Sequence, residues 1–190
     1  MVSKSDTNVP GLNTGQLPVD VAESSLISRA LPAKDEIMEW LHAVKDPEIP
    51  VLSLVDLGVI TDIRISESGR VEVEMTPTFS GCPAMDVMRQ GVEQELSAHG
   101  IADYKVNISF EKPWSSDKIT ARGREALKRF GLAPPAYTHG QTDIDLIEQA
   151  ICPRCNSHDT LIKSIFGPAL CRSLHYCNTC KQGFEQFKPI

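Results

Sequence analysis

The sequence lacks any run of about 20 consecutive apolar residues, the length that a helix needs to cross a bilayer. Its first thirty residues are polar and contain no apolar run of the kind found in signal peptides. Excess positive charge is also missing, because the formal net charge of the 190 residues is −6. We therefore expect a cytoplasmic protein with neither a membrane nor a nucleic acid as its partner.

Familiar catalytic motifs are absent as well. The sequence has no Ser-His-Asp arrangement, phosphate-binding glycine loop or paired-histidine metal motif. It also lacks the repeated Glu-x-x-His helices of a di-iron bundle, the cysteine run of a ferredoxin and a dinucleotide fingerprint. These absences favour a protein that is not itself catalytic.

Hydrophobic periodicity predicts a small α+β domain over residues 32–133. Alternating apolar residues predict strands at 61–65, 71–75 and 104–110, the first two joined as a hairpin. Helical spacing predicts helices that begin near Pro32, near Pro83 and near Asp117. The predicted order is α-β-β-α-β-α, and the inner face of the last helix should carry Ile119, Gly123, Ala126, Leu127 and Phe130.

Three further segments surround this domain. Residues 1–31 show no periodicity and are predicted to be a flexible extension. A linker is expected at 134–149, after the helix-breaking pair Pro134-Pro135, and a zinc ribbon at 150–190.

The predicted zinc ribbon depends on four cysteines in two pairs. Cys152 and Cys155 are separated by two residues, as are Cys177 and Cys180. This spacing lets two tight turns supply four thiolates to one tetrahedral ion, and five of the six cysteines lie in a segment too short to build an adequate core alone. We therefore expect one structural zinc per chain. Iron, as in rubredoxin, is the alternative, but Asn156 and Lys181 stand where rubredoxin-type turns usually have glycine.

Two other side chains of the ribbon are spare potential ligands. We interpret Cys171 as a packed core thiol and His175 as a surface side chain, since His175 precedes Tyr176 on an expected strand.

Cys82 stands apart from the other cysteines, directly before a predicted helix. Pro83 suits the first position of a helix, which would place Cys82 at or beside the N-cap, where backbone amides lower a thiol pKa. Such a thiol can be a nucleophile or a soft-metal ligand, or it can be a small buried apolar group. Local chemistry leaves both interpretations open. Asp46 and Glu48 lie in a proline-rich segment that could line the Cys82 site.

These motifs together resemble a known family. The segments 46–50 (DPEIP), 54–60 (LVDLGVI), Thr76-x-Thr78 and 80–83 (SGCP) are similar to the signature of the iron–sulfur cluster assembly (FSCA) domain, as in SufT-like proteins. With the segments 119–127 (ITARGREAL), 152–155 (CPRC) and 164–167 (SIFG), the sequence resembles the PaaD family, which is encoded with the bacterial phenylacetyl-CoA 1,2-epoxidase of phenylacetate catabolism.

The resemblance implies an accessory role beside a multicomponent monooxygenase. Its partners would be the oxygenase or reductase subunits of the epoxidase, and a homodimer is left open. The candidate site for transient iron or an iron–sulfur cluster consists of Cys82, Asp46, Glu48, Thr76 and Thr78. The alternative that the sequence leaves open is a stoichiometric, non-catalytic subunit that stabilises the complex.

Overall fold

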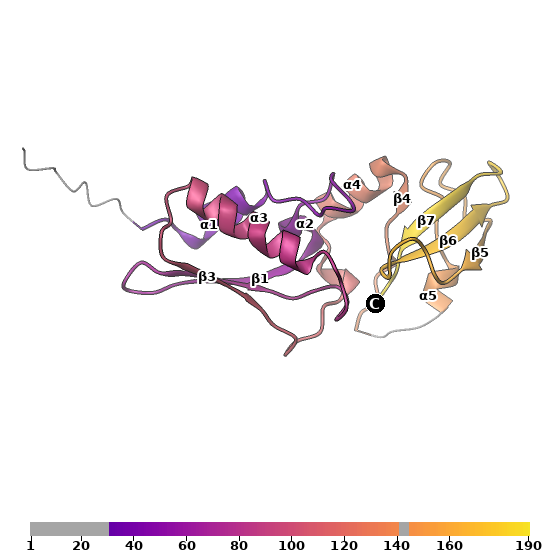
Figure 1. The fold of residues 1–190 in the computed structure, drawn as a ribbon. Helices are drawn as coiled ribbons and strands as arrows, with labels where there is room; N and C mark the ends of the chain where they lie inside the picture. Colours follow the sequence, from indigo (N-terminus) through magenta and orange to yellow (C-terminus); the bar gives the residue numbers. More distant parts are fainter. Residues whose placement is uncertain (1–30, 141–144) are drawn as a thin grey trace, which may run out of the picture. The chain divides into compact units, whose positions relative to one another are not determined.

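The computed structural model describes residues 31–140 and 145–190, so the flexible extension predicted at 1–31 lies almost entirely outside the described residues. The described chain begins with the α+β domain that the periodicity predicts (Figure 1). Its elements are α1 (Lys34–Leu41), α2 (Leu54–Leu57), β1 (Ile60–Ile65), β2 (Val71–Met75), α3 (Met85–Ala98), β3 (Tyr104–Ile108), a 3-10 helix (Ser116–Lys118) and α4 (Ala121–Phe130). The predicted order and fold class are confirmed, with α2 as a short addition.

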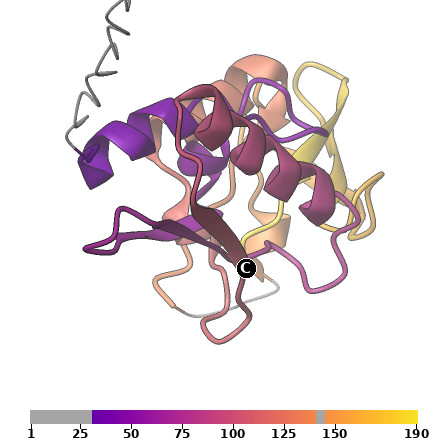
Figure 2. The same cartoon turned by 60° about the vertical axis from the view of Figure 1, so that its left-hand side comes forward.

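The sheet of this domain has the order β1-β2-β3. β1 and β2 pair antiparallel as the predicted hairpin, whereas β2 and β3 pair parallel, with α3 as the crossover between them. Val71, Val73 and Met75 on β2 are fully buried, and the intervening Glu72 and Glu74 point to the opposite face. Figures 1 and 2 show α1 and α3 on one face of this sheet, so the main core lies between these helices and the strands.

Asp56 connects the start of α2 to the start of α4. Its carboxylate accepts hydrogen bonds from the Ser53 hydroxyl (2.7 Å), the Thr120 hydroxyl (2.8 Å) and Arg122 Nε (3.0 Å). Ser53 and Thr120 are also the N-caps of the two helices. Burial alone would raise the pKa of Asp56, but the hydrogen bonds from Arg122, Ser53 and Thr120 outweigh burial and lower it. The charged form of Asp56 therefore holds this corner of the domain together.

The C-terminal part of the chain forms a second sheet. Its order is β4-β7-β6-β5, from β4 (Leu132–Ala133), β5 (Thr160–Ser164), β6 (Arg172–Cys177) and β7 (Gly183–Phe187), with the short α5 (Asp145–Glu148) beside β5. β4 directly follows α4 and pairs parallel with β7. Leu132 and Ala133, which the predicted boundaries place in the first domain (32–133), therefore contribute a strand to the ribbon sheet.

The ribbon and the α+β domain also share core residues. Phe187 at the end of β7 is 1% exposed and packs with Trp114, their ring centroids 5.8 Å apart. The Trp114 indole N–H donates to the Leu57 carbonyl (3.1 Å), and the Ser116 N–H donates to the carbonyl of the last residue, Ile190 (2.7 Å). The described residues from Leu31 onward thus belong to one compact unit.

Phe130, expected on the inner face of the last helix, and Phe110, the last residue of the predicted third strand, both face solvent. Phe130 is 46% exposed, because it is the last residue of α4 and the helix ends at Gly131, whose φ of +92° closes it. Phe110 is 58% exposed, because β3 ends two residues earlier, at Ile108. Among the described helices, none is both long and apolar enough to span a membrane.

Candidate metal centre and the Cys82 cavity

The four ribbon cysteines lie on two turns of matching geometry. In each turn the amide after the second cysteine donates to the carbonyl of the first: Asn156 N–H to Cys152 O and Lys181 N–H to Cys177 O, both at 2.9 Å. Asn156 and Lys181 both have φ of +59°, the left-handed conformation that rubredoxin-type turns usually give to glycine. Asparagine and lysine adopt here the backbone that a metal-binding turn requires.

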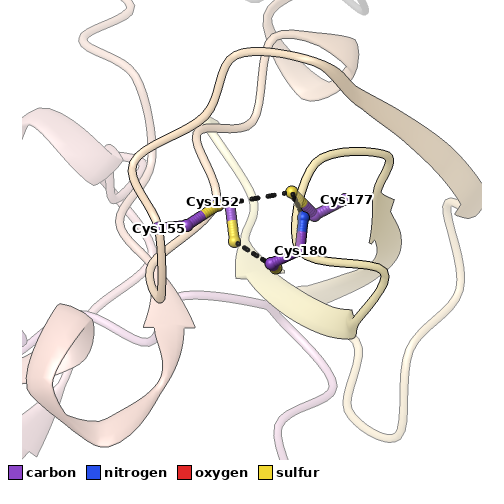
Figure 3. A group of neighbouring side chains, drawn as sticks. All are labelled: Cys152, Cys155, Cys177 and Cys180. Atoms are coloured by element: carbon purple, nitrogen blue, oxygen red, sulfur yellow. Dashed lines mark hydrogen bonds between the residues drawn. The ribbon is translucent and has the colours of Figure 1, made fainter.

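The turns bring four sulfur atoms together, all within 4.8 Å of one another (Figure 3). Cys152 Sγ lies 3.7 Å from Cys180 Sγ, and Cys155 Sγ lies 3.5 Å from Cys177 Sγ. A regular tetrahedron with metal–sulfur bonds of about 2.3 Å has sulfur–sulfur edges of about 3.8 Å. The arrangement therefore fits a four-thiolate structural metal site.

Burial and hydrogen bonding also suit such a site. Cys152 and Cys177 are fully buried in a small core with Phe184, whereas Cys155 is exposed. The Cys180 N–H, which lies 3.5 Å from Cys177 Sγ, donates to that sulfur and lowers the pKa of Cys177 to about 6. A thiolate is thus available to a metal ion at neutral pH.

Cys171 and His175, the two spare potential ligands of the ribbon, do not belong to the four-sulfur cluster. His175 is 2% exposed, so its expected surface position is wrong. Its Nε2 lies 2.9 Å from the Ser173 hydroxyl, and its ring stacks on Phe184. Burial lowers the pKa of His175 and keeps the ring neutral. The inner face of β6 carries Ser173, His175 and Cys177, so the alternation places Tyr176 on the outer face.

Cys82 lies in a loop before α3, so the predicted position at or beside the N-cap of this helix is wrong. The N-cap is Ala84, so Cys82 is two residues earlier, and its N–H donates to the Phe79 carbonyl (3.1 Å). Burial raises the pKa of the Cys82 thiol, and the carboxylates of Asp46 and Glu48 raise it further, against a lowering by the Ala84 amide. The expectation of a lowered pKa is therefore wrong, because burial and two nearby acids outweigh the amides.

The two acids near Cys82 are placed differently. Asp46 is 7% exposed, and its Oδ1 accepts hydrogen bonds from the backbone N–H groups of Glu48 and Ile49, both at 2.8 Å. Burial raises the pKa of Asp46, although these amides oppose the shift. Asp46 thus shapes the loop, whereas the Glu48 side chain is 43% exposed and lines a cavity together with Cys82.

This cavity has a volume of about 310 Å³. It brings together Cys82, Glu48 and Thr78 among the predicted site residues. Thr76 is not among the lining residues: it is 3% exposed, and its N–H donates to the Val59 carbonyl (2.8 Å). Sequence reasoning missed the opposite wall, which comes from the ribbon loop at residues 167–171.

Comparisons with known proteins agree with this architecture. Residues 34–110 match the family described as iron–sulfur cluster assembly protein, and residues 138–188 match the PaaD zinc beta ribbon domain. The fold and the cysteine cluster therefore define an iron–sulfur assembly domain that carries a zinc ribbon. An Escherichia coli protein named as one of the subunits of 1,2-phenylacetyl-CoA epoxidase is 34% identical, over 87% of this chain and 98% of its own. This chain belongs to the PaaD family.

Other proteins match a smaller share of this chain. An Fe-S protein maturation auxiliary factor of Porphyromonas gingivalis is 34% identical over 53% of this chain and 93% of its own. A crystal structure of a Bacillus anthracis domain of unknown function, DUF59, is 28% identical and covers 50% of this chain and 90% of that one, with a TM-score of 0.47.

Proposed function

We propose that this protein is an accessory factor of the bacterial phenylacetyl-CoA 1,2-epoxidase in phenylacetate catabolism, and that it helps to insert or maintain iron or iron–sulfur cofactors in the epoxidase subunits. Two comparisons support the proposal. The epoxidase relative matches nearly from end to end, and the family of iron–sulfur cluster assembly proteins matches residues 34–110, which include Cys82.

The observation that carries the proposal is the Cys82 cavity. A thiol, a half-exposed carboxylate and a hydroxyl face one open space, on Cys82, Glu48 and Thr78. A thiolate with oxygen ligands holds iron more weakly than a closed shell of four thiolates, and weak binding suits a cargo that must be passed on. In this mechanism Cys82 gives its proton to solvent as its sulfur binds the ion, Glu48 supplies charge, and Asp46 holds the Glu48 loop in place.

The ribbon has a separate role in this proposal. Zinc is the ion that we assign to Cys152, Cys155, Cys177 and Cys180, because the chain matches a zinc ribbon family and a closed four-thiolate shell is typical of structural zinc. The ribbon would dock the oxygenase or reductase subunit that receives the cargo. The protein itself would not catalyse the epoxidation.

Deleting the gene in a phenylacetate-degrading bacterium tests this function. The epoxidase subunits purified without oxygen from the deletion strain should contain less iron or sulfide than those from the parent. Complementation with the wild-type gene should restore the content, and complementation with Cys82→Ala should not. Full iron and sulfide in the subunits from the deletion strain would refute the maturation role.

The second candidate is a stoichiometric subunit of the epoxidase complex, which the name of the E. coli relative favours. Such a subunit should co-purify with the oxygenase subunits at an equal molar ratio. Its loss should abolish activity while the metal content of the remaining subunits stays normal. A maturation factor instead predicts no equimolar co-purification and a lowered metal content in the remaining subunits.

A further inference from the structure

Cys82 shares its cavity with a second thiol, that of Cys171 in the ribbon loop between β5 and β6. The two residues are far apart in sequence, and they come from the α+β domain and the ribbon respectively. Both are partly buried, both are free thiols, and both pack against the main core. The cavity therefore has a cysteine on each of its two walls.

Several contacts fix the loop that carries Cys171. The Gly167 N–H donates to the Arg172 carbonyl (3.0 Å), and a Cβ on Gly167 would lie only 2.9 Å from that oxygen, so the turn requires glycine. The Lys188 N–H donates to the Cys171 carbonyl (2.9 Å), and Lys188 Nζ donates to the Leu170 carbonyl (2.9 Å). Lys188, the residue that follows β7, thus binds the loop at Leu170 and at Cys171 and fixes the backbone position of Cys171.

The ribbon also holds the acidic loop on the other wall. Arg172, directly after Cys171, is 9% exposed, and its Nη2 donates to the Glu48 backbone carbonyl (3.0 Å). The same nitrogen lies 4.0 Å from the Glu48 carboxylate, while Nη1 pairs with Glu185 at 3.0 Å. One buried guanidinium therefore ties Glu48 to the strand that begins beside Cys171.

The electrostatics of the two thiols agree with one shared environment. Burial raises the pKa of Cys171 to about 11, and the charges of Glu48 and Asp46, which also act on Cys82, contribute to the shift. Both thiols are therefore protonated at neutral pH. A metal ion could still bind, because coordination to sulfur displaces the proton.

We propose that Cys171 and Cys82, with Glu48, form a second and exchangeable site for a thiophilic divalent ion such as Fe²⁺, built across the ribbon and the α+β domain. Two thiols bind one ion and release two protons to solvent, without any redox change. The proposal rests on the proposed function, whose cargo site it completes. The ribbon then contributes a ligand to the cargo in addition to its own structural metal.

The proposed Cys82–Cys171 site differs from the structural site in how closely its ligand atoms are grouped. Among the described residues, the four ribbon cysteines are the one group of three or more Cys, His, Asp or Glu side chains placed to hold a metal ion, with their sulfur atoms within 4.8 Å of one another. Cys82, Cys171 and Glu48 instead line an open cavity and do not form such a group. An open donor set favours exchange, whereas a closed shell favours retention.

Cobalt titration of the full-length protein tests this site. Zinc first fills the ribbon and stays there, because zinc binds such sites more tightly than Co²⁺. Co²⁺ is then added without oxygen, and the thiolate-to-cobalt charge-transfer absorbance is recorded, since its intensity grows with the number of Co–S bonds. We expect a band in the wild type, about half of it with at least tenfold weaker binding in Cys82→Ala and in Cys171→Ala, and none in the double variant.

Leu170→Ala is the matched control, because it changes the same cavity wall without removing a thiol and should leave the titration unchanged. Zinc content and circular dichroism check the fold of each variant, and Cys171→Ser replaces Cys171→Ala if the latter is unfolded. Loss of the band in Cys82→Ala with full binding in the Cys171 variants would overturn the two-thiol site and leave the proposed function standing. Unchanged binding in the Cys82 variant would overturn both.

Discussion

Replacing Cys155 by serine separates a structural metal from ordinary packing. Its side chain is exposed, whereas Cys152 and Cys177 are fully buried. An exposed residue without a special role changes stability by about 0.5 kcal/mol or less when it is substituted. If Cys155 only covered the surface, Cys155→Ser would therefore have almost no effect on the free energy of unfolding.

A metal ligand predicts a much larger loss. A structural zinc contributes about 10–16 kcal/mol of folding free energy at neutral pH in small zinc domains. The four sulfurs share this contribution, and Cys155 Sγ lies 3.5 Å from Cys177 Sγ inside the cluster. Removing one of four ligands should thus cost about 2.5–4 kcal/mol, since the remaining three cannot close the shell.

Urea denaturation with zinc present measures this loss, together with the zinc content of each purified variant. Arg154→Ala is the matched control, because Arg154 is an exposed neighbour in the same turn and not a ligand. After zinc is removed with a chelator, Cys155→Ser and the wild type should become equally stable. A Cys155→Ser variant that keeps one zinc per chain and wild-type stability would refute the metal centre.

Three further predictions concern the first domain and can be checked by denaturation at several pH values. Asp46→Asn keeps a carbonyl oxygen for the two loop amides and should change stability by about 1 kcal/mol or less, whereas Asp46→Ala should cost about 2–4 kcal/mol. Because the folded-state pKa of Asp46 is raised, the wild type should lose stability relative to Asp46→Asn as the pH rises from about 4 through that pKa; equal pH profiles would contradict this. Asp56→Asn should lower the free energy of unfolding by about 1–2 kcal/mol at pH 7, because it weakens the hydrogen bond to Arg122. Because the folded-state pKa of Asp56 is lowered, the difference in stability between the wild type and Asp56→Asn should vanish as the pH falls through that pKa. Gly58→Ala should cost about 2–3 kcal/mol, since φ is +74° and the new Cβ would lie 2.6 Å from Lys118 Cβ; a neutral effect would show that the turn adapts.

Much of the fold follows from local patterns in the sequence. The alternation at Val71, Val73 and Met75 predicts a strand with one buried face, and all three side chains are fully buried. The paired cysteines likewise predict the metal centre, because two residues between cysteines already fix the turn that joins them. Such features depend on neighbours a few residues away, which a single sequence displays directly.

The wrong or missing predictions occur where two local sequence signals disagree or where a segment is too short to show a pattern. Pro83 is an acceptable first residue of a helix, yet α3 begins at Met85. His175 and Tyr176 are adjacent on a strand, and their polarity alone favours the wrong one for burial. The helix α2 has only four residues, too few to display a helical period.

The Cys82 cavity shows the larger limit. One wall can be located from the sequence, because Cys82, Glu48 and Thr78 belong to recognisable motifs. The other wall, with Cys171, depends on packing between segments far apart in the chain. Arg172 and Phe187, whose contacts bring the ribbon against the first domain, have no local pattern that predicts their partners.

We expect the protein to hold one metal permanently and another transiently. Metal analysis after purification without oxygen from iron-replete cells tests it most directly, by comparing the wild type with Cys82→Ala. We expect about one zinc per chain in both proteins, and iron that a weak chelator removes in the wild type alone. Equal labile iron in the two proteins, or none in the wild type, would contradict the account.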